Sequence, residues 1–250
     1  MYIPHSNGEK KIVILTGAGI SAPSGIQTFR GLNGLWNNYK IDDICNEYTW
    51  LENYNQVHEF YNQRRIELEN KVPNIAHLKI KEWMDKYQDD IILITQNIDD
   101  LFEKAQIEKE KILHLHGFLK EIICLNCNNI INVNYSKIDE KNYICPHCNE
   151  KVKIKPNIVF FNGQAPMYSY MKRAFDYLNN PNSIFIVIGT SGNVIDVNRI
   201  AKKAYYSKKI LANLEHSDSI KEYYFNRVHI GNIEDTIFKI EKDIETFWNK

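Results

Sequence analysis

Four of the five cysteines of this 250-residue chain form two C-x-x-C pairs, a spacing that suits a tetrahedral metal site. The pairs, Cys124/Cys127 and Cys145/Cys148, are separated by 17 residues. Two tight turns that each present two thiolates complete the coordination of one Zn²⁺ and leave no position open for catalysis. We therefore expect one structural zinc ion. The alternatives are two disulfides, a redox-active pair, or a zinc ribbon that binds nucleic acid.

A second group of residues with chemical potential is the stretch Thr16-Gly17-Ala18-Gly19-Ile20-Ser21-Ala22. It follows an apolar run and fits the G-x-G-x-x-G/A pattern of dinucleotide-binding turns. Gly17 permits the tight turn, Gly19 lets a pyrophosphate approach the backbone, and Ala22 lets a helix pack on the strand. A helix beginning here would direct its N–H groups at phosphates. The motif therefore favours phosphate binding, the alternative being a glycine turn with no ligand.

The residues after this turn do not continue as in a hydride-transferring domain. Such a domain has a second strand and an acidic residue about 20 residues further on, which binds the ribose. Here residues 27–36 are polar and interrupted by glycines, and no second strand is evident. The sequence thus supports dinucleotide binding and argues against a dehydrogenase.

Buried parallel strands are the elements that must position these residues. Continuous apolar runs predict strands at 11–15, 91–94, 184–188 and 209–214, and a shorter strand at 112–117. Strand character also resumes at 154–161. The predicted helices cover 54–69, 75–87, 167–178, 197–205 and 233–247. Because the carboxyl ends of parallel strands meet at one edge, we expect an α/β fold with a Rossmann-like doubly wound sheet and a site at that edge.

The stretch GAGISAPSGIQTFRG and the motifs TQNID and HLHG resemble the sirtuins, the NAD-dependent protein lysine deacylases, and the resemblance covers nearly the whole chain. It implies that His116 is the general base that activates a ribose hydroxyl, while His114 is the weaker candidate. The residues that the resemblance assigns to NAD are Gly17, Ala18, Gly19, Thr28, Phe29, Arg30, Gln96, Asn97, Asp99, Gly189, Thr190, Ser191, Asn213, Glu215 and Ile233.

The segment Tyr61-Asn62-Gln63-Arg64 resembles the Tyr-x-x-Arg motif of the sirtuins that remove acidic acyl groups. At positions i and i+3 of a helix, Tyr61 and Arg64 share a face, and a phenol and a guanidinium can bind the distal carboxylate of succinyl- or malonyl-lysine. In the same class of sirtuins a small residue stands at the position of Cys45 and leaves room for a longer acyl chain, and a cysteine is nearly as small. The alternative is an amphipathic helix with an arginine that extends to solvent.

Residues 158–163 resemble the family strand that pairs with the substrate backbone, which assigns Val159 and Phe161 to substrate binding. The alternative is an ordinary core strand. The chain departs from the family pattern nearby and in the first motif. Pro23 replaces an acidic residue, Gln27 replaces a proline, and Asn162-Gly163 replaces Gly-Glu. These departures affect loop geometry and peptide preference, and none removes a catalytic group.

The composition narrows the remaining classes. A formal net charge of zero argues against a broad basic surface that would bind nucleic acid. No apolar run approaches the length of a membrane span, and the first ten residues lack the pattern of a signal peptide. We expect a cytoplasmic monomer that binds neither membranes nor nucleic acid and whose partners are acylated lysines of proteins or peptides. Three parts are expected: a Rossmann-like domain at 1–34, 77–118 and 155–250, a helical insertion at 35–76, and a zinc module at 119–154.

The resemblance implies an enzyme that removes acyl groups from lysine with NAD and zinc as cofactors. It transfers the acyl group to ADP-ribose and releases nicotinamide. Two other functions fit the same motifs: an NAD glycohydrolase or ADP-ribosyltransferase, which consumes NAD without an acyl peptide, and a module that binds NAD or ADP-ribose without catalysis.

Overall fold

The larger of the two sheets is parallel and has the strand order of a dinucleotide-binding domain. A computed structural model describes residues 3–28 and 40–248. Six strands of this part lie in the order β3-β2-β1-β7-β8-β9, which is 3-2-1-4-5-6 along the chain. Their bounds are β1 (Ile12–Thr16), β2 (Ile91–Thr95), β3 (Ile112–His114), β7 (Ile184–Ile188), β8 (Lys208–Asn213) and β9 (Arg227–Ile230). The order reverses between β1 and β7, so a ligand crevice is expected beyond their carboxyl ends.

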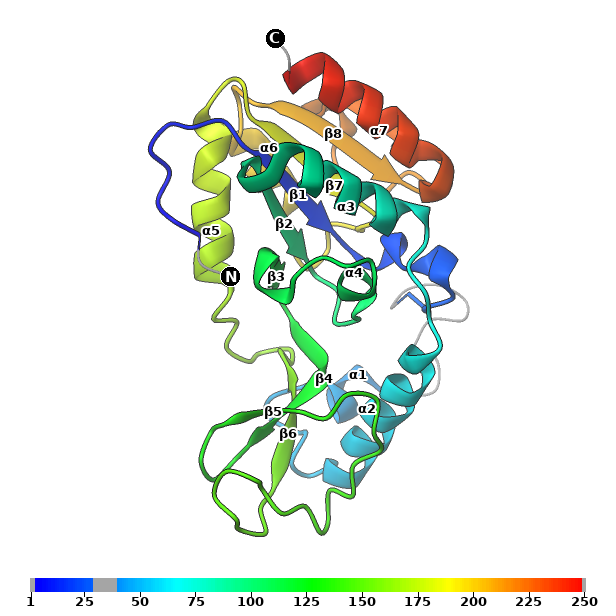
Figure 1. Ribbon diagram of the computed structural model, residues 1–250, viewed down its shortest axis with the longest axis vertical. Helices are drawn as coiled ribbons and strands as arrows, with labels where there is room; N and C mark the ends of the chain where they lie inside the picture. Colours follow the sequence, from blue (N-terminus) through cyan, green and yellow to red (C-terminus); the bar gives the residue numbers. More distant parts are fainter. Residues whose placement is uncertain (1–2, 29–39, 249–250) are drawn as a thin grey trace.

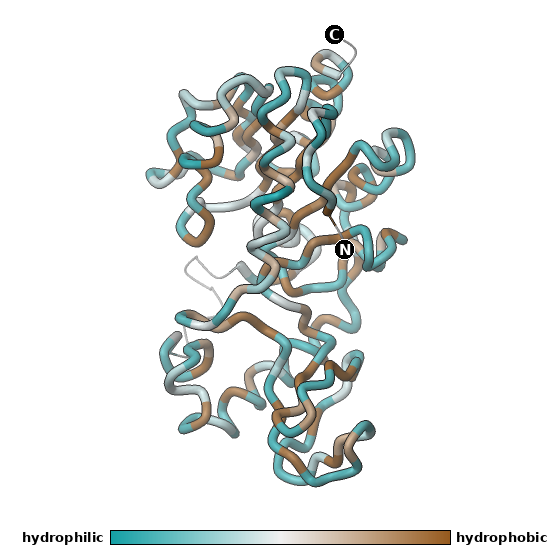
Figure 2. Tube along the Cα trace, turned by 90° about the vertical axis from the view of Figure 1, so that its left-hand side faces the viewer, coloured by the Kyte–Doolittle hydropathy of each residue, from teal (hydrophilic) through white to brown (hydrophobic). Residues whose placement is uncertain are grey.

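Helices cover both faces of this sheet (Figure 1). On one face, α3 (Ile75–Tyr87) and α7 (Ile233–Trp248) enclose a core that includes Ile12 and Ile14. The opposite core holds Val13 and Leu15 and is closed by α5 (Tyr168–Asp176) and α6 (Val197–Lys203). Because both faces are covered, the central strands are apolar at every position, and this produces the continuous runs in the sequence. Figure 2 shows these hydrophobic segments passing through the interior of the same half.

The second sheet is small and antiparallel and lies below the first along the long axis of the molecule (Figure 1). Its order is β5-β4-β6, formed by β4 (Gly117–Cys124), β5 (Ile130–Asn132) and β6 (Ile154–Ile158). The helices α1 (Ile41–Ile44) and α2 (Tyr54–Glu69) lie beside it, and Val57 and Phe60 of α2 share a core with Leu119 and Ile158. The short helix α4 (Leu101–Lys104) follows β2.

The chain passes from one sheet to the other through two residues, Leu115 and His116. The amide of Leu115 still donates to the Thr95 carbonyl at the end of β2, at 2.9 Å. The next carbonyl, that of His116, accepts from Val159 just beyond β6, also at 2.9 Å. Gly117 then adopts φ +92°, and a Cβ there would lie 1.9 Å from a backbone oxygen. The crossing is therefore anchored by hydrogen bonds to both sheets.

Several predicted elements are confirmed, and others end elsewhere. The helices at 54–69 and 75–87 and the strand at 184–188 have the predicted bounds. The helix expected after the glycine motif is replaced by two 3-10 turns, Ala18–Ile20 and Ala22–Ser24. The strand expected at 112–117 ends at His114, where the chain leaves the sheet. The strand expected at 154–161 ends at Ile158, and α5 ends at Asp176, where a 3-10 turn follows. None of the described helices has the length and apolarity needed to cross a membrane.

Candidate functional site

A cavity of about 800 Å³ lies at the carboxyl ends of the parallel strands and extends to β6 and α2. It collects most of the residues that the sequence assigned to ligands. Those on its wall are Gly17, Ala18, Gly19, Thr28, Tyr61, Gln96, Asn97, His116, Val159, Phe161, Gly189, Thr190, Ser191, Asn213, Glu215 and Ile233. Asp99 and Arg64 are described but do not line it. Phe29 and Arg30 lie outside the described residues.

The glycine turn after β1 is locked against the end of β7. Gly17 donates to the Ile188 carbonyl at 2.9 Å, and Gly19 donates to the Gly189 carbonyl at 2.8 Å. A Cβ on Gly19 would lie 2.7 Å from the Cα of Gly189. The missing side chain at Gly19 therefore serves the close crossing of two backbone turns, a reason different from the predicted approach of a pyrophosphate. Pro23 suits its place inside the second 3-10 turn, where the lost N–H has no helical partner.

A hydrogen-bonded group behind this turn fixes the TQNID segment. The side-chain amide of Asn97 donates from Nδ2 to the Gly17 carbonyl at 3.2 Å and to the Ser21 hydroxyl at 3.0 Å. Ser21 in turn donates to the Asp99 carboxylate at 2.9 Å. Asp99 is 8% exposed, and burial raises the pKa of its carboxyl to about 6. Asn97 thus reaches the cavity, while Asp99 holds Ser21 from behind.

His116 has a defined tautomer. Its Nδ1 lies 2.9 Å from the backbone carbonyl oxygen of Gln96. This oxygen can only accept a hydrogen bond, so Nδ1 carries the proton. Its Nε2 lies 3.0 Å from the Tyr168 hydroxyl and is left as the acceptor. Burial lowers the pKa of His116, which favours the neutral ring at physiological pH. A neutral imidazole with its acceptor nitrogen at the cavity wall is the form that a general base requires.

His114 occupies a different environment. Its Nδ1 lies 3.3 Å from the Asn97 carbonyl oxygen, and its Nε2 lies 2.8 Å from Glu103. It is not among the residues that line the cavity. The structure therefore separates the two histidines of HLHG, and only His116 faces the site.

Tyr61 and Cys45 line the part of the cavity that extends to α2. The Tyr61 ring stacks on Phe160 at 5.9 Å between ring centroids, and its hydroxyl bonds to the Cys45 thiol. Arg64, one turn along α2, lies over the Phe60 ring at 4.7 Å and donates to the Glu67 carboxylate at 3.0 and 3.1 Å. In the described part of the chain, its buried Nε has no hydrogen-bond partner.

The segment after β6 is a bent edge and not a continued strand. Phe161 donates to the Cys45 carbonyl at 2.9 Å and accepts from Glu47 at 3.0 Å, so one side of it is already paired. Asn162 adopts φ +65°, and Gly163 then donates to the Phe160 carbonyl at 3.0 Å. Asparagine is among the few side chains that tolerate this conformation. Its replacement of the family glycine therefore preserves the turn.

The four cysteines of the C-x-x-C pairs form one cluster whose ligand atoms lie within 4.8 Å of one another. The Sγ atoms of Cys124 and Cys148 are 3.9 Å apart, and those of Cys127 and Cys145 are 3.8 Å apart. A tetrahedral zinc with Zn–S bonds of about 2.3 Å places its sulfurs about 3.8 Å apart. The four residues fit one structural zinc ion. The paired sulfurs lie well beyond the length of a disulfide bond, about 2.05 Å, and all four thiols are free, so the geometry favours the zinc site over the disulfide alternative.

Several residues on the cavity wall were not singled out from the sequence. They are Ile98, Ala165, Tyr168, Val194, Ala212, Leu214, His216, Ser217, Gly231 and Thr236. Leu214, His216 and Ser217 directly follow β8, so the position of a strand end was a usable signal. Tyr168 begins α5 after an irregular loop, and the sequence offers no pattern that marks it.

Comparison with known proteins identifies the family. The family model described as "Sir2 family" matches residues 17–196, well over half of the chain. The chain belongs to the Sir2 family. This Sir2-family chain is 42% identical to an NAD-dependent protein deacylase of Campylobacter jejuni strain RM1221, over 95% of the chain and 97% of the relative. It is 38% identical to a protein of the same name from Helicobacter hepaticus, over 95% and 98%.

Solved structures agree with this membership. A mutant Sir2 homologue in complex with ADP-ribose superposes with a TM-score of 0.81 at 29% identity, over 95% of this chain and 92% of that one. A Sir2 homologue in complex with NAD gives a TM-score of 0.77 at 29% identity, over 95% and 90%. The predicted Rossmann-like fold with an additional small module is thereby confirmed.

Proposed function

We propose that this Sir2-family chain is an NAD-dependent protein lysine deacylase and that its substrates include lysines with acidic acyl groups such as succinyl and malonyl. The observation that carries the proposal is the position of His116. Its acceptor nitrogen faces a cavity that is shared by the dinucleotide-type turns of the parallel sheet and by the Tyr61–Cys45 wall. The named deacylase relatives support the same reaction.

Different residues along the cavity have different proposed roles in the reaction. NAD supplies the ribose to which the acyl group is transferred. Both N–H groups of the Asn97 side chain donate to Gly17 and Ser21, which fixes the side chain and leaves its Oδ1 as an acceptor for the N–H group of a carboxamide. His116 accepts the proton of a ribose hydroxyl at Nε2, and the Gln96 carbonyl bonded to Nδ1–H stabilises the resulting imidazolium. The position of the cavity between the parallel sheet and β6 limits the access of water, which would otherwise hydrolyse bound NAD.

The preference for acidic acyl groups rests on Arg64. Its guanidinium lies one helical turn from Tyr61, and its buried Nε is without a partner among the described residues. The terminal nitrogen of Arg64 pairs with the exposed Glu67 carboxylate of the same helix at 3.0 and 3.1 Å, and we propose that an acyl carboxylate competes with Glu67 for it. Arg64 does not line the cavity in its present position, so the proposal requires its guanidinium to exchange Glu67 for an acyl carboxylate that reaches past Tyr61, which would also satisfy Nε. Cys45 leaves the space beside Tyr61 that the longer chain requires.

The test compares acetyl- and succinyl-lysine on one peptide, following nicotinamide release and deacylated product. Arg64→Met removes the charged hydrogen bonds to the acyl carboxylate. Such bonds contribute about 1.5–3 kcal/mol, so kcat/KM for succinyl-lysine should fall about 10- to 100-fold. The value for acetyl-lysine should change less than about threefold, because that group lacks the carboxylate. Arg173→Met removes an arginine of α5 that does not line the cavity and should affect neither substrate.

The outcomes separate the alternatives. Equal losses on both peptides would discard the preference for acidic acyl groups and leave the deacylase. Nicotinamide release that does not depend on either peptide would indicate an NAD glycohydrolase. An active His116→Ala variant would remove the base from the mechanism.

A further inference from the structure

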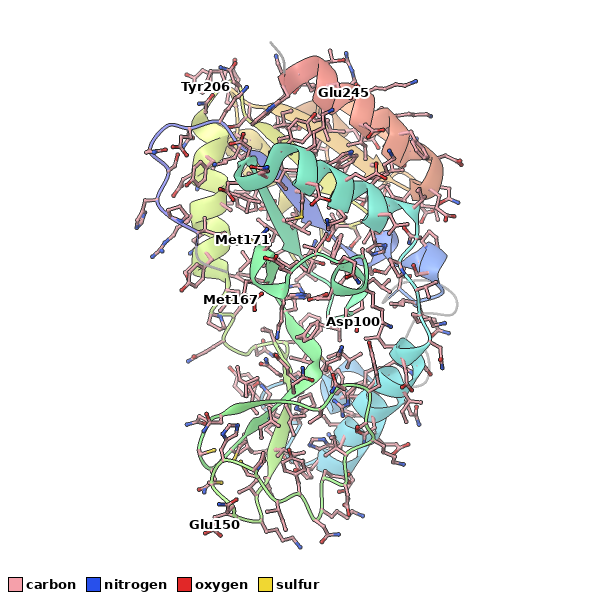
Figure 3. All side chains as sticks on the ribbon, viewed as in Figure 1. Asp100, Glu150, Met167, Met171, Tyr206 and Glu245 are labelled. Atoms are coloured by element: carbon pink, nitrogen blue, oxygen red, sulfur yellow. The ribbon has the colours of Figure 1, made fainter. Side chains whose placement is uncertain are left out.

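Tyr168 is a cavity residue to which neither the motifs nor the proposed reaction assigns a role. It begins α5, between Met167 and Met171, which Figure 3 labels at the end of this helix nearest the smaller sheet. The Tyr168 ring is partly buried against the second core, and its hydroxyl reaches the imidazole of His116. The two ring centroids are 6.1 Å apart at 45°, so the contact is made through the hydroxyl and not by stacking.

The hydrogen bonds around His116 fix the direction of this contact. The proton on Nδ1 is committed to the Gln96 carbonyl, and therefore Tyr168 donates to Nε2. Burial raises the pKa of Tyr168, so the phenol is protonated and can donate. An imidazole nitrogen has a single in-plane lone pair, which means that the hydroxyl occupies the one acceptor position that the base uses. In the described part of the chain, the two partners of the ring are neutral and lie on opposite sides of it.

We propose that Tyr168 is a positioning residue for His116. Its hydroxyl holds the ring with Nε2 toward the cavity and keeps the base in the neutral tautomer, and a ribose hydroxyl takes its place as the donor when NAD is bound. The ribose O–H bond then breaks, its proton forms the new N–H bond at Nε2, and the electron pair stays on the ribose oxygen. The proposal rests on the proposed function for its catalytic meaning, but the contact itself can be tested without turnover.

The first measurement is an NMR titration of the His116 imidazole in the ligand-free protein. Tyr168→Phe removes the hydroxyl and keeps the ring. A donor to Nε2 stabilises the neutral imidazole, so its loss should raise the pKa of His116. A net hydrogen bond of about 0.5–1.5 kcal/mol corresponds to about 0.4–1 pH unit. Tyr170→Phe, two residues along the same helix and off the cavity wall, should leave the titration unchanged. An unchanged titration in Tyr168→Phe overturns the proposal.

The second measurement is the pH dependence of kcat/KM, which reports the free enzyme. In the profile of Tyr168→Phe, the decline of kcat/KM at acid pH should begin about 0.4–1 pH unit higher than in the wild type. At pH values well below this midpoint kcat/KM should be about three- to tenfold lower, and on the plateau at higher pH it should change less than about threefold. A uniform rise at every pH would show that Tyr168 only obstructs the site, and a uniform fall with a lower melting temperature would show a purely structural role. Either result overturns the proposal. A wild-type protein without deacylase activity would refute the proposed function alone, since the NMR titration needs no substrate.

Discussion

Replacing Gly19 by alanine should damage both stability and NAD-dependent turnover, because the new methyl group has no space. It would lie 2.7 Å from the Cα, 2.9 Å from the oxygen and 3.1 Å from the carbonyl carbon of Gly189. Carbon atoms in favourable contact are about 3.5–4.0 Å apart. These atoms belong to the backbone at the end of β7, so no side-chain rotation relieves the clash. Overpacking costs about 1–3 kcal/mol, and contact with backbone places this case near 3.

At about 2–4 °C per kcal/mol for a chain of this size, the melting temperature of Gly19→Ala should fall by about 6–12 °C. If the turn shifts outward instead, it moves into the cavity, and a displacement of about 1 Å can cost about 100-fold in rate. Thermal unfolding followed by circular dichroism and a nicotinamide-release assay measure both effects. Gly8→Ala is the control, because a Cβ there meets nothing within 4 Å and only backbone strain at φ +91° is added. A Gly19→Ala protein that melts within 2 °C of wild type and keeps full turnover would refute the reasoning.

Three further predictions concern the metal, the base and the buried carboxyl. Chelation should remove one zinc per chain and melt the antiparallel sheet; an apoprotein with unchanged thermal stability and activity would contradict a structural ion. Because burial lowers the pKa of His116, kcat/KM should be level at pH 7 and decline only in the acid range, whereas a decline beginning above pH 7 would point to another base. Burial raises the pKa of Asp99 from 3.8 to about 6, so its contribution to stability is lost as pH rises from about 4 to 6. Asp99→Asn should remove this loss of about 2–3 kcal/mol, which is measured as the difference between the free energies of unfolding in urea at pH 4 and at pH 7.5. The same difference in the wild type and in Asp99→Asn would contradict the prediction.

The central strands and long helices were predictable because their causes are local. The strand at 184–188 is apolar throughout since both of its faces are covered, and the helix at 54–69 has no Gly or Pro to interrupt it. The strand β9 was missed because it is short and lies at the edge of the sheet, where exposed and partly buried positions give no apolar run. The turns after Gly17 were predicted as a helix, but the crossing with Gly189 imposes 3-10 geometry.

In the candidate site, too, the residues with a local sequence signal were predictable and those brought together by the fold were not. Motif residues such as His116 and Asn97 were predicted from their types and spacing, and the structure places both among the residues that line the cavity. The structure also places Asp99 behind the cavity wall, a distinction that depends on the fold of the loop and not on the spacing. Tyr168 meets His116 only through the packing of α5 against the parallel sheet, a contact between residues 52 positions apart. The sequence contains no local trace of such a contact.

The two-residue crossing between β3 and β4 makes His116 a residue that both sheets hold. Its imidazole is bonded to the backbone of Gln96, which follows β2, and its own carbonyl accepts from Val159 just beyond β6. A displacement of either sheet at this point would therefore reach the base directly, through a single covalently joined residue.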